Sequence, residues 1–251
     1  MVYPVQRSHS YKKKAKKKKR SKFPFIISIA IIVVIAALGF VFFLHNNLMN
    51  SKEMTDERVD YVFYMNGLEQ IYFIRTDRKQ KINYLISIPK ISYEPIMAIS
   101  MDQPSPRDIS RSVEKLFGAS DLAFFSSIDE NAYQKIRKIG DLNDSPDFFE
   151  LTINQFVRML ESIKLDWYEF LIFRNTKKLI ETQNEHNYTK NSTYRLINNI
   201  TKYANKEVPM TFMTKAPVKI TVTDSQGSQN DYERLYIDDK SLDTIMEFMK
   251  K

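Results

Sequence analysis

The longest apolar stretch of the chain lies near its amino terminus. Phe23 to Leu44 contains no charged residue, and a run of lysines ends just before it. A helix of that length rises about 33 Å, which is enough to cross a hydrocarbon core of about 30 Å. The pattern predicts one membrane-spanning helix, then a polar juxtamembrane linker over residues 45–58 and a domain over residues 59–251. The rest of the chain holds only short apolar runs, so we expect a single span.

A cleaved signal peptide is the main alternative for this stretch. Such a signal has an apolar region of about 7–15 residues and then a cleavage site with small residues. Here the apolar region is longer and ends in the bulky sequence FVFFLHNN. The pattern therefore favours an uncleaved anchor.

Short β-branched and aromatic runs open the domain. The dipeptide Asn66-Gly67, a strong signal for a tight turn, separates the first two runs, and Pro89 ends the third. Short polar turns between adjacent strands are typical of an antiparallel meander. We expect its strands at residues 59–65, 70–75 and 82–88.

Helical periodicity then alternates with short strands. The first helix is delimited by Ser105 as N-cap, Pro106 at the first helical position and Gly118 at the end. Ser127 or Asp129 can cap the second helix. This second helix is expected to end at Gly140. Further helices are expected at residues 152–160, 165–181, 193–203 and 241–250. Further strands are expected at residues 122–125, 218–222 and 234–237.

The segments between these elements read as loops. Residues 91–104 contain two prolines and are expected to form a loop with at most a short strand, while residues 182–191 form a polar loop and 224–231 a surface turn. In the helix over residues 165–181, the positions expected to be buried are Leu165, Tyr168, Leu171, Ile172 and Leu179. Strands and helices that mix in this way predict an α/β or α+β layered domain, with a central mixed sheet flanked by helices.

Charge is distributed very unevenly along the chain. The tail over residues 1–22 holds ten of the 38 Lys and Arg residues and no acid, which leaves 28 bases against 30 acids. Lysines beside a membrane helix stay in the cytoplasm and can touch anionic lipid heads. A nucleic-acid or nuclear-localisation patch is the alternative, but no aromatic residue lies between Lys12 and Lys22. We expect a cytoplasmic amino terminus, an extracytoplasmic domain and no nucleic-acid partner.

The composition excludes several kinds of active site. The chain has no cysteine, three histidines and five glycines. Zinc sites that depend on Cys are excluded, and the scattered histidines leave little for a His-based metal site or a Ser/His/Asp triad. Few glycines also leave little room for a Gly-rich phosphate loop. The residues alone therefore name no catalytic site.

The order of several segments resembles that of the LytR–CpsA–Psr family. Lys81–Lys90 is similar to its strand and S-I-P-R-D segment, Ser112–Ile136 to its helix, strand and acidic block, Leu151–Leu160 to its L-x-G-x-Q-A-L helix, and Tyr232–Met249 to its closing strand and helix. The resemblance covers residues 59–251 and rests on pattern more than on identity. It implies a bacterial single-span protein whose α/β domain transfers glycopolymers from a polyprenyl-pyrophosphate carrier to the cell wall, with Mg²⁺.

The departures from the family pattern concern the chemistry. The family's arginines grip a pyrophosphate, which suits their bidentate fork. Here Lys90 and Ile91 follow Ser-Ile-Pro where the family has Arg and Asp. Of the paired arginines of the family's helix, at best Arg158 remains. By resemblance, Lys90 and Arg158 are the candidate catalytic phosphate contacts, and Glu69 is the candidate metal ligand.

Three functions follow as hypotheses. Each lost arginine removes a charge-assisted bond of about 1.5–3 kcal/mol, so we expect weak or no transferase activity. The first hypothesis is a degenerate family member that binds a polyprenyl-linked or polymeric glycan during cell-wall assembly. The second is an active glycopolymer phosphotransferase with a reduced site and Mg²⁺. The third is a non-enzymatic, membrane-tethered scaffold for other envelope proteins.

Overall fold

A computed structural model describes residues 23–142, 144–166, 168–223 and 229–250. The basic tail and most of the turn predicted over residues 224–231 lie outside this part of the chain. The chain divides into two compact units, residues 1–43 and residues 44–251. Each unit is described by itself.

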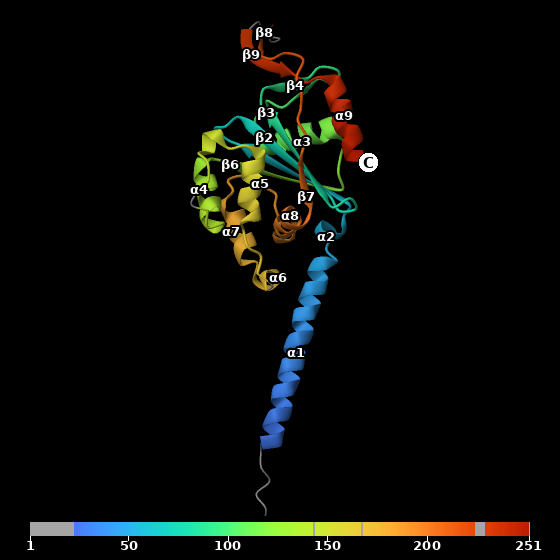
Figure 1. Cartoon of the computed structure of the whole chain (residues 1–251), viewed down its shortest axis with the longest axis vertical. Coiled ribbons are helices and arrows are strands. Elements are labelled where there is room, and N and C mark those ends of the chain that lie inside the picture. Colours follow the sequence, from blue (N-terminus) through green and yellow to red (C-terminus); the bar gives the residue numbers. More distant parts are fainter. Residues whose placement is uncertain (1–22, 143, 167, 224–228, 251) are drawn as a thin grey trace, which may run out of the picture. The chain divides into compact units, whose positions relative to one another are not determined.

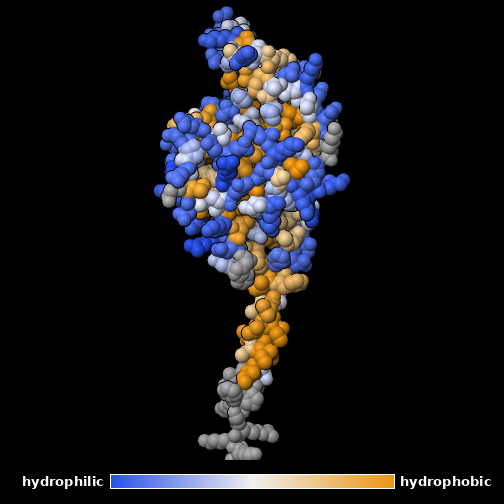
Figure 2. Space-filling model, viewed as in Figure 1, coloured by the Kyte–Doolittle hydropathy of each residue, from blue (hydrophilic) through white to orange (hydrophobic). Residues whose placement is uncertain are grey.

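Helix α1 (Phe23–Met49) contains the apolar stretch. Its segment Ile27–Met49, 23 residues long, is apolar enough to cross a membrane by length and composition. Its large apolar side chains from Ile27 to Phe43 are mostly exposed, whereas Leu48 near its end is buried. Figure 2 shows this helix as an almost uninterrupted hydrophobic surface. The helix ends at Met49, five residues later than Leu44, the end predicted from the sequence. The polar residues His45, Asn46 and Asn47 are thus part of the helix.

A five-stranded mixed sheet forms the centre of the second unit (Figure 1). Its strand order is β6-β1-β2-β3-β7, and β1 to β3 form the predicted antiparallel meander. The outer strands β6 and β7 pair parallel to β1 and β3. The strands are β1 (Arg58–Met65), β2 (Gln70–Asp77), β3 (Ile82–Pro89), β6 (Leu122–Ile128) and β7 (Ala204–Glu207).

Strand β7 was missed by the sequence pattern. Its sequence Ala-Asn-Lys-Glu has no alternation of apolar and polar residues, and the strand is mostly exposed at the sheet edge. The backbone of β3 holds it in place through register pairs such as Ile82 with Ala204, and Asn205 adds side-chain hydrogen bonds. An edge strand without a buried face leaves no hydrophobic signal in the sequence.

A smaller sheet of order β5-β4-β9-β8 lies at one end of the unit. Its strands are β4 (Ser92–Glu94), β5 (Ile99–Ser100), β8 (Val218–Thr223) and β9 (Gln229–Tyr236). Strands β4 and β5 fall in residues 91–104, which were expected to be mainly loop. Both are very short, and β4 is held by parallel pairing to the distant strand β9.

Helices cover both faces of the central sheet (Figure 1). One face packs against α3 and α9, and the other against α4, α5, α7 and α8. The predicted layered α/β domain is therefore confirmed. The helices of this unit are α2 (Lys52–Thr55), α3 (Pro106–Phe117), α4 (Glu130–Ile139), η1 (Phe148–Glu150, a 3₁₀ turn), α5 (Ile153–Glu161), α6 (Glu169–Ile172), α7 (Arg174–Thr182), α8 (Lys190–Lys202) and α9 (Asp239–Lys250).

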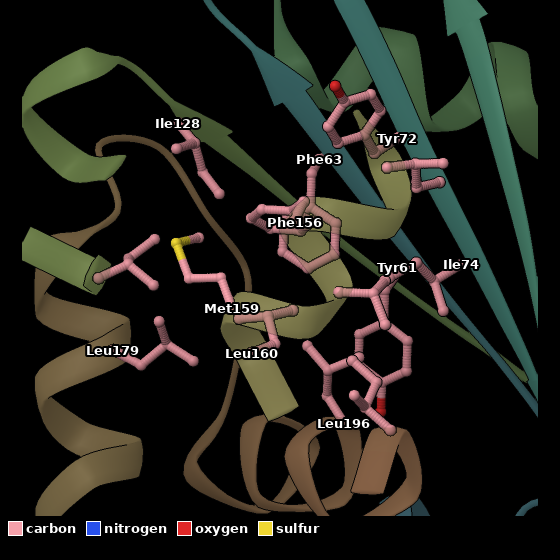
Figure 3. Packing of buried hydrophobic residues seen from close by; sticks show 14 of the residues in the cluster. Tyr61, Phe63, Tyr72, Ile74, Ile128, Phe156, Met159, Leu160, Leu179 and Leu196 are labelled. Carbon is pink, nitrogen blue, oxygen red and sulfur yellow. The ribbon is translucent and has the colours of Figure 1, made fainter. Parts of the chain in front are cut away.

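Aromatic rings fill the space between the sheet and helices α4, α5, α7 and α8. The ring of Phe63 on β1 meets that of Phe156 on α5 edge to face, with centroids 4.9 Å apart. Tyr72 and Tyr61 flank this pair, and Met159 and Leu160 complete the contact from α5 (Figure 3). Such offset ring pairs add to the free energy gained by burying apolar area.

The starts of α3 and α4 follow the predicted capping residues. The side chain of Ser105 accepts a hydrogen bond from the backbone N–H of Asp108, and Pro106 is the first residue of α3. Thr152 and Gln155 form a reciprocal capping box at the start of α5. Of the two candidate caps for α4, Asp129 is the one used, because its carboxylate accepts from the N–H of Ala132 at 2.7 Å.

The prediction of one continuous helix over residues 165–181 is wrong, because the segment forms two helices, α6 and α7. Residues 164–166 are irregular, and Phe173 interrupts the segment between α6 and α7 with φ 49° and ψ 40°, in the left-handed region. Ile172, expected to be buried, is 55% exposed, whereas Leu179 is buried as predicted. Leu165, Tyr168 and Leu171 are partly buried.

The side chain of Glu169 accounts for this break. It is fully buried, and its Oε1 accepts hydrogen bonds from the N–H of Asn175 at 2.6 Å, the N–H of Thr176 at 2.9 Å and the hydroxyl of Thr176 at 2.7 Å. Glu169 thus satisfies the free N–H groups that begin α7. A helix continued through Phe173 would need no such acceptor, and local periodicity could not indicate the choice.

Candidate functional site

Lys90 lies between two carboxylates at the end of β3. Its Nζ is 3.3 Å from Oε2 of Glu69 and 3.7 Å from Oδ1 of Asp102. The ring of Tyr64 lies beneath the ammonium, 5.2 Å from Nζ to the centroid, and the Tyr64 hydroxyl donates to Oε1 of Glu69 at 3.1 Å. These four side chains form what we call the Lys90 cluster.

The meander brings this cluster together. Met65 pairs with Gln70, and Gln70 pairs with Pro89, so the turn between β1 and β2 lies beside the end of β3. The N–H of Lys90 donates to the carbonyl of Glu69 at 2.9 Å. Glu69 itself has φ 53°, a left-handed conformation that aims its side chain across the sheet end. The contact between Glu69 and Lys90 is therefore fixed by backbone register.

The cluster favours the charged form of Lys90. Partial burial lowers the pKa of Lys90, but its hydrogen bonds and charge interactions with Tyr64 and Glu69 outweigh burial and raise that pKa above the ordinary value. The pKa of Tyr64 is also raised, first by burial. Lys90 thus remains a cation with its charge already balanced by its neighbours.

A polar cleft of about 610 Å³ opens beside the cluster. Among the described residues that line it, Lys90 is the only base, against the acids Asp102 and Glu185. Most of the other described lining residues have polar side chains that can form hydrogen bonds, and Tyr64 adds an aromatic ring. The described residues that line the cleft are Tyr64, Asn66, Lys90, Asp102, Gln103, Pro104, Pro106, Ser127, Asn184 and Glu185.

Two chain segments that are far apart in sequence close the far wall of this cleft. The N–H of Ser127, at the end of β6, donates to the carbonyl of Glu185 at 2.8 Å, and the N–H of Asn184 donates to the carbonyl of Ser127 at 3.2 Å. The side chain of Asn184 also donates to Asp129 at 2.8 Å. Asp129, the N-cap of α4, therefore also holds the side chain of Asn184 in this wall.

Arg158 lies in a different place. It is exposed on α5 and lines a separate pocket of about 310 Å³ with Tyr133, Asp144 and Gln155. The structure thus brings Glu69 and Lys90 together but does not bring Arg158 into their cleft. Asp102 and Tyr64, which sequence reasoning did not single out, join Lys90 instead. The only sequence signal for Asp102 was its position in the proline-containing loop after β3.

The cluster is poorly suited to Mg²⁺. Within the described ranges, no group of three or more His, Cys, Asp or Glu side chains could hold a metal ion. Mg²⁺ is usually held by one or two carboxylates together with substrate phosphates. Here the ammonium of Lys90 lies within ion-pair distance of both Glu69 and Asp102, so it takes the position that a cation would need. We derive no chemical step through a metal.

Solved structures share this fold. Bacillus subtilis TagV aligns with a TM-score of 0.51 at 9% identity, over 78% of this chain and 97% of that chain. Lmo1026 from Listeria monocytogenes aligns at 0.48 with 14% identity, over 80% and 97%. The LytR-CPS2A-psr family protein YwtF (TagT), with bound octaprenyl pyrophosphate lipid, aligns at 0.48 with 9% identity, over 80% and 92%.

The chain therefore has the LytR–CpsA–Psr fold, which confirms the predicted resemblance at the level of the fold. At these identities the similarity describes the fold alone. No protein-family model matches the chain, and no curated protein matches it either.

Proposed function

We propose that this chain is a membrane-anchored protein of the bacterial cell envelope that binds a polymeric or polyprenyl-linked glycan without transferring it. The LytR–CpsA–Psr fold and the matching order of sequence segments support a role with envelope glycopolymers. The apolar helix α1 and the basic tail before it support an anchor with a cytoplasmic amino terminus and an extracytoplasmic domain.

The observation that carries the proposal is the position of Lys90 between Glu69 and Asp102. A pyrophosphate site needs an excess of cations, and arginine forks supply it best. Lys90, the one base among the described residues that line this cleft, is balanced by Glu69 and Asp102, and Glu185 adds a further negative charge. A phosphate group would meet net repulsion there.

An uncharged, hydroxyl-rich ligand suits the same wall. Asn66, Gln103 and Asn184 offer amide donors and acceptors, and the carboxylates can accept from hydroxyl groups. Tyr64 adds an apolar ring with a polar tip. The sugar units of a glycan, rather than its phosphates, therefore fit the cleft best.

Binding and transfer are tested separately with the full chain in detergent. The ligand is a cell-wall glycan, offered with and without its polyprenyl-pyrophosphate carrier. We expect binding in both forms and no transfer with Mg²⁺. Gln103→Ala should weaken binding roughly tenfold, in keeping with a lost hydrogen bond of about 1.5 kcal/mol.

The matched control for this experiment is Asn154→Ala, an amide removed from an exposed position on α5 outside the cleft. It should leave binding unchanged. No binding to either form of the glycan, or equal losses in the two variants, would overturn the proposal. Transfer that Lys90→Ala abolishes would instead support an active phosphotransferase that uses Glu69 and Lys90.

A scaffold for other envelope proteins is the second candidate, favoured by one exposed apolar feature. Ile96 and Met97, in the turn between β4 and β5, are 75% and 49% exposed. Large apolar side chains grouped at a loop tip are typical of contact surfaces. Crosslinking of the full chain in native membranes should then give one discrete partner, which the double change Ile96→Ser and Met97→Ser would remove.

A further inference from the structure

A second polar cavity lies at the opposite end of the central sheet from Lys90. Lys90 follows the end of β3 that pairs with Gln70, whereas Arg78 follows the end of β2 where Asp77 pairs with Ile82. The cavity measures about 190 Å³. It is lined by Met49, Met54, Arg78, Arg195, Asn198, Asn199 and Tyr203.

Arg195 is a buried cation whose neighbours are neutral acceptors. Its side chain on α8 is only 1% exposed. Nη1 donates to the carbonyl of Glu53, and Nη2 donates to the carbonyl of Asp56 at 2.8 Å. Within the described part of the chain, Arg195 makes no ion pair with a carboxylate. Buried charges in proteins are normally paired.

A second arginine shares the cavity. Arg78 is exposed and donates to the carbonyl of Thr55 at 2.8 Å, and it too lacks an ion pair with any described carboxylate. Burial lowers the pKa of Arg195, and the charge of Arg78 lowers it further. Two like charges thus line one cavity, and neither forms an ion pair with a described carboxylate.

The acidic neighbours do not remove this excess. Asp56 attracts Arg195 but lies beyond ion-pair distance. The carboxylate of Glu53 accepts from the hydroxyl of Thr189 at 3.2 Å. Arg58 and Asp77, which are close in sequence, pair with each other at 3.3 Å. The described residues that line the cavity thus include two bases and no acid, in contrast to the Lys90 cleft.

One residue of the apolar helix α1 lines this cavity. Met49, one of its lining residues, is the last residue of α1. Along that helix, Met49 lies about 8 Å beyond Leu44, the predicted end of the span. Headgroup layers extend a bilayer from about 30 Å to about 40–45 Å, so each layer adds about 5–8 Å. If the span is in a membrane, Met49 therefore lies at headgroup depth.

We propose that Arg78 and Arg195 bind the phosphate of an anionic phospholipid headgroup. Guanidinium groups match phosphate oxygens bidentately, and the amides of Asn198 and Asn199 can donate further hydrogen bonds. Met49 and Met54 supply apolar surface for the adjoining glycerol and acyl carbons. The site goes beyond the proposed glycan function and depends only on its membrane anchor.

The test uses the full chain in uncharged maltoside micelles and native mass spectrometry. The probes are phosphatidylglycerol, phosphatidylcholine of the same acyl chains, and inorganic phosphate as a competitor. Arg78→Gln removes the exposed arginine, and Asn198→Asp places a carboxylate in the cavity. The control is Lys79→Gln, which removes an equal charge from the neighbouring exposed residue outside the cavity.

The wild-type chain should retain one phosphatidylglycerol in preference to phosphatidylcholine. Arg78→Gln and Asn198→Asp should each weaken retention roughly tenfold, the size expected for a lost charge-assisted bond, and Lys79→Gln less than about twofold. Equal retention of the two lipids, or an equal loss in Lys79→Gln, would overturn the proposal. Inorganic phosphate that competes as strongly as the lipid would overturn the lipid assignment, leaving a simple phosphate site.

Discussion

Arg75 on β2 and Asp60 on β1 form a bidentate ion pair inside the domain. Nε of Arg75 is 2.8 Å from Oδ1 of Asp60, and Nη2 is 2.7 Å from Oδ2. The guanidinium also donates to the carbonyls of Phe117 at 3.0 Å and Gly118 at 2.7 Å. One side chain thus joins two strands of the central sheet to the carboxyl end of α3.

Removing Arg75 should be strongly destabilising. Arg75→Ala would leave the buried carboxylate of Asp60 without its cation, at a cost of about 3–5 kcal/mol in the free energy of unfolding. Denaturant unfolding followed by circular dichroism would measure the loss. The control is Arg111→Ala, because Arg111 pairs with Asp108 and the two side chains are 57% and 39% exposed; it should cost less than about 1 kcal/mol. Similar losses in both variants would contradict this account.

Glu169 should matter for helix α7 through its acceptor oxygen. Glu169→Ala removes the partner of three donors from Asn175 and Thr176, so we expect a loss of about 2–4 kcal/mol in the free energy of unfolding. Glu169→Gln keeps an oxygen at that place and should lose less. Hydrogen exchange of the amides of Asn175 and Thr176 would locate the effect. Unchanged protection in Glu169→Ala would rule out the capping role.

Asp129 should make the stability of the domain depend on pH in the acid range. The N–H of Ala132 lowers the pKa of Asp129, and the amide of Asn184 lowers it further. The carboxylate form is therefore favoured in the folded state. Its stabilising contribution is present above the unfolded pKa, which is near 3.8, and is lost as the pH falls through the lower folded pKa.

The change Asp129→Asn tests this dependence, since asparagine can still cap α4 but does not titrate. Unfolding measured from pH 5 to pH 2 should show a shallower loss of stability in the variant than in the wild type. Glu130→Gln, an exposed neighbour on the same helix, serves as the control. An identical slope in wild type and Asp129→Asn would contradict the assignment.

Lys90→Ala should create a site for divalent cations. Without the ammonium, the carboxylates of Glu69 and Asp102 both remain within ion-pair distance of the vacated position. Oxygen ligands of this kind suit Mg²⁺ and Ca²⁺. Calorimetric titration should detect Mg²⁺ binding in the variant that is at least tenfold tighter than in the wild type. The double variant Lys90→Ala with Asp102→Asn should lose that gain, and equal affinity in wild type and Lys90→Ala would refute the prediction.

Much of the fold is predictable because its signals are local. The meander follows from three β-branched runs and the Asn66-Gly67 turn, whose glycine has φ 98°. The caps Ser105, Asp129 and Thr152 act on their own helix starts, so a window of a few residues contains the whole interaction. The order of segments also indicated the fold that TagV shares.

The candidate site was predictable only in part. The segment after Ser-Ile-Pro indicated Lys90, and the remnant acid indicated Glu69. Their contact depends on the register of β1, β2 and β3, and Asp102 reaches them from a loop with no periodic signal. Arg158 belongs to a helix face on another pocket, and linear order could not reveal that separation.

The sequence by itself determined the apolar helix, the basic tail before it, the near-neutral domain and the layered α/β class. Hydrophobic periodicity and local capping carry that information along the chain. Only the tertiary structure decided which charges meet. It balances Lys90 between Glu69 and Asp102 and, within the part of the chain that the structure describes, leaves Arg78 and Arg195 without an ion pair. The reason is physical, because an ion pair depends on a distance of a few ångströms in space, and residues far apart in sequence reach it only when strand register and helix packing bring them together.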